Sequence, residues 1–84
     1  MGSSIRAIVD INMKANEFSS SIVLVVSPDH FIDAKSILGL SMTLYRDQTY
    51  RLYIHGPDEA EAKAAMLDVF AKHHLNAVLH GDLE

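Results

Sequence analysis

The feature that most constrains this chain is the run Ile22-Val23-Leu24-Val25-Val26, in which four of five consecutive residues are β-branched. Such a run is typical of a strand, and apolar residues on both of its faces predict a central place in a sheet. The turn sequence Ser27-Pro28-Asp29-His30 follows it. Proline in the second turn position predicts a hairpin, in which Phe31-Ile32 returns as a short antiparallel strand.

The segment before this hairpin predicts a helix. Between Arg6 and Phe18 the apolar residues recur at spacings of three and four, as one helical stripe that contains Ile8, Ile11 and Ala15. The alternative is a strand that alternates from Ile5 to Ile11, which would turn Ile8 to the wrong face. Both interpretations remain open from the sequence, with the helix favoured.

After the hairpin the pattern predicts a short helix, a strand and a long helix. Ser36 precedes a short apolar segment, and its hydroxyl can accept a hydrogen bond from the free amides of a first helical turn. Beyond a polar break at 46–48, apolar and polar residues alternate over 50–55, which predicts a strand with one buried face. Gly56-Pro57-Asp58-Glu59 opens the last helix. Its expected inward residues are Ala60, Ala64, Leu67, Phe70 and Ala71.

Composition limits the classes of protein that this chain can represent. Its 84 residues predict one domain, and the absence of cysteine excludes disulfides, thiolate catalysis and cysteine-based zinc sites. The net charge of −4 offers no basic surface for nucleic acid. The aliphatic runs are too short for a membrane span, and no signal peptide is recognised, so we expect a cytoplasmic protein. Residues 1–4 and 83–84 are typical of vector-derived ends.

Three segments resemble the HPr phosphocarrier family of the bacterial phosphotransferase system. Ala34-Lys35-Ser36-Ile37-Leu38-Gly39-Leu40 is similar to the family's regulatory-serine segment, 14–18 to the end of its first helix, and 56–60 to the start of its last helix. The resemblance implies an α+β, open-faced, two-layer sandwich in which an antiparallel sheet packs under helices. The first strand of the family is missing from this chain.

The resemblance also bears on phosphocarrier chemistry. HPr carries a phosphoryl group on a histidine that an arginine follows two residues later. Here the arginine position is Arg6 and the histidine position is Ser4. A serine phosphate is a stable ester that does not pass its phosphoryl group onward as a phosphohistidine does. We therefore expect no carrier activity and no catalytic residue, unless the natural chain begins further upstream with a histidine of its own.

A second family function depends on serine, and here the resemblance is retained. It implies that Ser36 is a regulatory phosphorylation site for an HPr kinase, and that Ile37, Leu38 and Leu40 form a docking surface for a catabolite control regulator. Crh-like members of the family, which lack the carrier histidine, keep this role alone. The alternative is a degenerate module that only self-associates, in which Ser36 is merely a helix cap.

The remaining expectations concern organisation and partners. We expect an HPr-like domain over 5–74 and an extension over 75–84, in which a strand fills the vacant sheet edge within the chain or by exchange in a dimer. Val23, Val25 and Tyr53 would give the sheet an apolar second face, which favours a homodimer. His30 falls in a turn, His55 at a strand end, and the adjacent His73 and His74 would point about 100° apart on a helix, so neither a metal nor another cofactor is expected.

Overall fold

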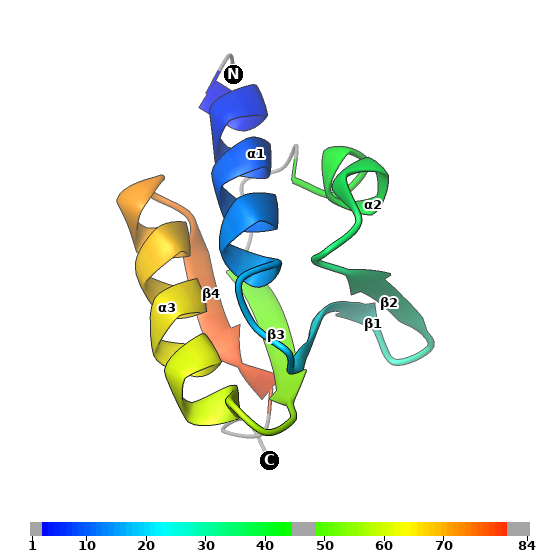
Figure 1. Cartoon of the computed structure of the whole chain (residues 1–84). Coiled ribbons are helices and arrows are strands. Elements are labelled where there is room, and N and C mark those ends of the chain that lie inside the picture. Colours follow the sequence, from blue (N-terminus) through cyan, green and yellow to red (C-terminus); the bar gives the residue numbers. More distant parts are fainter. Residues whose placement is uncertain (1–2, 45–48, 81–84) are drawn as a thin grey trace.

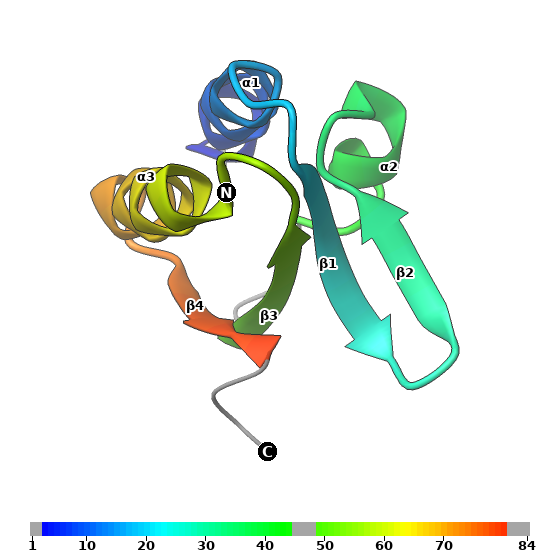
Figure 2. The same ribbon diagram turned by 60° about the horizontal axis from the view of Figure 1, so that its bottom comes forward.

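The computed structural model describes residues 3–44 and 49–80. Three helices lie on one face of a four-stranded sheet, and no described helix covers its other face (Figures 1 and 2). The α+β, open-faced, two-layer sandwich is therefore confirmed. The elements in chain order are α1 (Ser3–Ala15), β1 (Ser21–Ser27), β2 (His30–Asp33), α2 (Ile37–Ser41), β3 (Thr49–His55), α3 (Glu59–Lys72) and β4 (Asn76–Leu79).

The N-terminal segment is helical, as the apolar stripe predicted, and the alternative of a strand is wrong. Ile11 and Ala15 are wholly buried and Ile8 is 9% exposed, so this stripe is the face that α1 turns toward the sheet. Helix α1 packs against both α2 and α3. From the middle of α1, Asp10 Oδ2 lies 2.8 Å from His73 Nε2, a polar contact that joins this helix to the C-terminal end of α3.

The apolar run and its hairpin occupy the positions expected of them. The sheet order is β2-β1-β3-β4, so β1 is an inner strand that pairs antiparallel with both β2 and β3. Ile22 and Leu24 are buried under the helices together with their antiparallel partners Ile54 and Leu52. The alternation predicted for β3 is confirmed by its burial. The polar break at 46–48 lies outside the described residues.

Strand β4 fills the sheet edge beside β3, and it pairs there parallel to β3. This corrects the expectation of a wholly antiparallel sheet. Strand β3 is followed by α3, which carries the chain back across the sheet, so that the next strand starts at the same end as β3. The possible strand in 75–84 is thus present, and in this single chain it fills the vacant edge by itself.

The inward face of α3 differs from the predicted one. Its buried residues are Ala62, Met66, Val69 and Phe70, whereas Ala60, Ala64 and Ala71 are exposed and Leu67 is half-buried. Alanines lie on several sides of this helix, so periodicity alone does not select a face. The larger side chains of Met66 and Val69 bury more apolar surface than alanine does, which explains why they face the core.

The loops before β1 and before α3 are joined by a compact polar cluster. The Asp58 carboxylate accepts hydrogen bonds from the backbone N–H groups of Ser19 and Ser20 at 2.9 Å and from the Ser20 hydroxyl. Gly56 has a φ of 151°, and a Cβ placed there would lie 2.6 Å from the Ser20 Cα atom. Only glycine allows the two loops to approach this closely.

Candidate functional site

The predicted regulatory residue, Ser36, caps the first turn of α2. Its backbone is extended, with φ −99° and ψ 111°, and its Oγ accepts a hydrogen bond from the Gly39 N–H at 3.2 Å. Lys35 anchors the preceding turn, because its ammonium group donates to the Phe18 carbonyl oxygen at 2.7 Å. Ser36 is itself exposed. The hydroxyl that caps the helix is thus also open to solvent.

Helix α2 presents apolar side chains to solvent directly after Ser36. Ile37 is 49% exposed, Leu38 is 69% exposed and Met42, at the C-cap, is 68% exposed. Leu40 is wholly buried in the core, which corrects its assignment to a docking surface. The reason is geometric: α2 packs against both α1 and β2, so its inward side chain joins the core.

A second group of exposed apolar residues lies on α1, which packs against α2. Ile5 is 75% exposed, Val9 37% and Met13 62%. Their spacing of four residues places them along one side of the helix. This group was not predicted from the sequence, because the inward stripe of Ile8, Ile11 and Ala15 by itself accounts for the helix. The signal was the i, i+4, i+8 spacing of a second apolar row.

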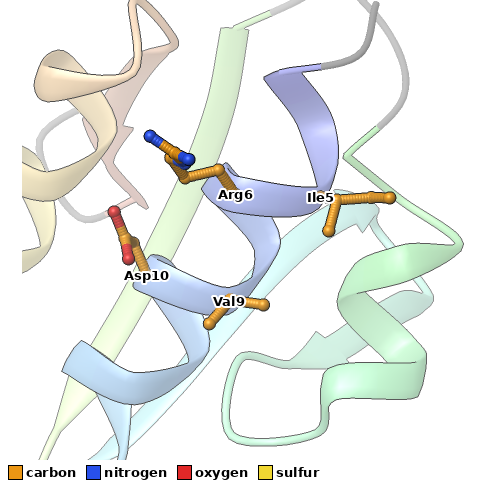
Figure 3. A pocket seen from close by; sticks show the side chains of 4 residues that line it. All are labelled: Ile5, Arg6, Val9 and Asp10. Carbon is orange, nitrogen blue, oxygen red and sulfur yellow. The ribbon is translucent and has the colours of Figure 1, made fainter.

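Arg6 lies on a different side of α1 from this apolar row. With Asp10, Ile5 and Val9 it lines a shallow depression, where the side chains of Arg6 and Asp10 project to one side of the helix and Ile5 and Val9 to the other (Figure 3). Both Ser4 and Arg6 are in the helical segment, near its start. The arrangement offers an exposed guanidinium that can attract an anion, but Ser4 provides no imidazole for phosphoryl transfer.

The groups with shifted pKa values are away from α2, at the start of α3. Hydrogen bonds from the Ser20 hydroxyl and from the Ser19 and Ser20 amides lower the pKa of Asp58. The Gly56 N–H, followed by Lys63, lowers the pKa of Glu59. Both effects stabilise ionised carboxylates that hold loops together. Their role is structural rather than acid–base chemistry.

Across the described parts of the chain, no group of three or more metal-ligating side chains is assembled. Nor does any helix within those parts have the length and apolar character needed to cross a bilayer. The features that stand out are therefore Ser36 and two groups of exposed apolar side chains on neighbouring helices.

Comparison with known proteins agrees with this fold. A family model described as the phosphotransferase-system HPr component phosphorylation site matches residues 1–72. An HPr dimer from Thermoanaerobacter tengcongensis is 29% identical, with a TM-score of 0.70 over 80% of this chain and 77% of that chain. Crh of Bacillus subtilis, described as an intertwined dimer with a swapping domain, is 28% identical, with a TM-score of 0.68 over 81% of this chain and 78% of that chain.

No protein with a curated description matches the sequence. The family model nevertheless spans most of the chain, and the two solved structures have a similar fold over 80% and 81% of it. The chain therefore belongs to the HPr family of the phosphotransferase system.

Proposed function

We propose that this protein is a regulatory member of its family, phosphorylated on Ser36 and bound by a protein partner through the apolar side chains beside it. The observation that carries the proposal is the exposed Ser36 hydroxyl next to the exposed Ile37 and Leu38, in an HPr-family chain with serine at the carrier position. Such a role implies an HPr kinase and a catabolite control regulator as partners, and a location in the bacterial cytoplasm.

The proposed reaction is phosphoryl transfer from ATP. The Ser36 Oγ would attack the γ-phosphorus and lose its proton to a base on the kinase, while the bond to the β-phosphate oxygen breaks and ADP leaves. The added phosphate would lie beside the Gly39 N–H, which donates to the Oγ of the unmodified residue. Negative charge is favourable next to free amides at the start of a helix.

The apolar side chains give the modified residue a surface that a partner can grip. Ile37 and Leu38 on α2, Met42 at its C-cap and Ile5 on α1 are each about half or more exposed. We define these four residues as the docking surface. Exposed apolar groups of this kind are typical of protein interfaces, and a neighbouring phosphate would add a charged group that arginine recognises.

The test is intact-mass spectrometry after incubation with ATP and an HPr kinase, in parallel with Enzyme I and phosphoenolpyruvate. The expected result is one added phosphate from the kinase alone, abolished in S36A and retained in S41A. Ser41 is a suitable control because it is an exposed serine on the same helix. Modification that persists in S36A, or phosphate transfer from Enzyme I, would reject the proposal.

Self-association is the second proposed property. Both related structures are described as dimers. In addition, the face of the sheet that no described helix covers carries Val23 and Tyr53, the latter 48% exposed, whereas Val25, also predicted for this face, is only 7% exposed. We propose that this protein also forms a homodimer, measurable as a concentration-dependent mass by light scattering.

A further inference from the structure

Strand β4 is an edge strand that contacts only β3 and α3 among the described elements with extensive packing. It pairs with β3 alone, from Thr49↔Asn76 to Leu52↔Leu79, at the edge of the sheet (Figure 2). Asn76 is exposed, and Ala77 and Leu79 are only partly buried against the core. Without β4, the core side chains that Ala77 and Leu79 cover and the backbone N–H and C=O groups along the edge of β3 would be exposed to water. The edge therefore needs a strand, but it does not need one from the same chain.

The connection from α3 to β4 contains a strained residue. The chain reverses direction within 73–75, where the His74 N–H donates to the Ala71 carbonyl and the Leu75 N–H to the Phe70 carbonyl, both at 2.9 Å. These two bonds are the pattern that normally ends a helix with glycine in the left-handed conformation. Here that residue is His74, with a φ of 60°. Opening the turn would release the strain that its Cβ causes.

The contact between α1 and α3 fixes the point at which the chain can open. The His73 side chain is only 11% exposed, and its Nε2 lies 2.8 Å from Asp10 Oδ2. Helix α3 also buries Phe70 completely in the core. The end of α3 is therefore anchored on its own chain through His73, and the segment that can leave begins at His74.

We propose that β4 is exchanged between two copies of this chain, so that β4 of each copy pairs with β3 of the other. Exchange would recreate the contacts of β4 with β3 and α3, now supplied by the partner copy, and the turn around His74 would open. The related Crh structure is described as a dimer with a swapping domain, which shows that this fold can exchange segments. The inference rests on the proposed self-association and names its mechanism.

A pair of engineered cysteines can distinguish exchange from other modes of association. Thr49 and Asn76 are parallel partners in β3 and β4, both are exposed, and the natural chain has no cysteine. The T49C/N76C protein would be refolded from a mixture of isotopically light and heavy chains, and its dimer isolated by size exclusion. A short thiol cross-linker would then be added and the product analysed by denaturing mass spectrometry.

Exchange predicts covalent dimers, including light–heavy pairs. The control is S21C/H55C, which joins exposed antiparallel partners in β1 and β3, away from Val23 and Tyr53, and should cross-link within one chain in every state. Cross-links within single chains of T49C/N76C dimers would overturn the exchange but leave self-association intact. Absence of dimers at every concentration would overturn both, without affecting the test of Ser36.

Variants of His74 provide an independent test that leaves both cross-linking positions unchanged. H74G removes the strain of the closed turn and should weaken dimerisation by about tenfold or more, since each dimer opens two such turns. H74V increases that strain and should strengthen dimerisation. Equal dimer affinities for H74G and H74V, or shifts in the reverse order, would overturn the proposal.

Discussion

At the scale of single residues, the cluster of Asp58, Ser20 and Gly56 shows how distant parts of the chain depend on one another. Ser20 is 1% exposed, and its hydroxyl both donates to the Asp58 carboxylate and accepts from the Asp58 N–H. These residues are 38 positions apart. The side chain of Asp58 therefore joins two loops instead of capping its own helix, for which it makes no side-chain hydrogen bond.

This cluster makes stability depend on pH in a defined direction. The ordinary pKa values of Asp58 and Glu59 are 3.8 and 4.5, and hydrogen bonds lower both in the folded protein. Their contribution to stability is thus present above these values and is lost as the pH falls through the lower, folded values. We expect the urea midpoint to drop in this acid range, and to drop less in D58N.

The control for D58N is D68N, an exposed position on α3. D68N should retain the acid dependence of the wild-type protein, since no comparable set of amides is described around Asp68. If the urea midpoints of D58N and the wild type changed in parallel between pH 3 and pH 7, the Asp58 cluster would not be the source of the pH dependence of stability.

At the scale of elements, α2 illustrates how a five-residue helix can serve both the core and the surface. Leu40 points inward and is 0% exposed, whereas Leu38 is 69% exposed two residues earlier. Residues two positions apart on a helix point about 200° away from each other, so Leu38 faces solvent while Leu40 faces the core. Gly39 between them allows α2 to approach Ile32 closely.

The two leucines should therefore respond differently to truncation. L40A is expected to destabilise the fold by about 2–5 kcal/mol, because it leaves a cavity in the core. L38A should change stability by less than about 0.5 kcal/mol but weaken binding of the regulator to the Ser36-phosphorylated protein. Denaturant unfolding and titration calorimetry measure the two effects. Strong destabilisation by L38A with unchanged partner binding would remove Leu38 from the docking surface.

At the scale of the whole molecule, the sheet is stabilised unequally from centre to edge. Strands β1 and β3 are each paired on both sides, while β2 and β4 are paired on one side only. The helices cover one face of this sheet (Figure 2). Local opening should therefore begin at the edges, where few buried side chains oppose it.

Hydrogen exchange provides the corresponding prediction. In dilute protein, the amides of β4 should exchange faster than those at Leu24 and Leu52, whose side chains are each 1% exposed at the centre of the sheet. Raising the protein concentration should protect β4 further if exchanged dimers form. The prediction is wrong if the amides of β4 exchange as slowly as those of β1 and β3 in dilute solution, since β4 would then open only when the whole domain unfolds.

The elements that could be predicted from the sequence depend on interactions within a few residues. The β-branched run of β1, the proline turn, the alternation in β3 and the Ser36 cap each combine local side-chain chemistry with a short period. The helical stripe of α1 belongs to the same class, because Ile8, Ile11 and Ala15 define one face. Ser36 itself follows from its place before α2, while its phosphorylation remains a proposal.

Other features required the tertiary structure, because they arise from contacts between residues far apart in the chain. The inward face of α3 was selected by what packs best against the sheet, since alanine fits on several of its sides. Leu40 is buried because α2 packs toward β2, and Asp58 is bound by a loop 38 residues away. The parallel pairing of β4 and the left-handed His74 follow from the return of the chain after α3. Sequence periodicity thus determined the local elements, and packing determined which of their faces meet.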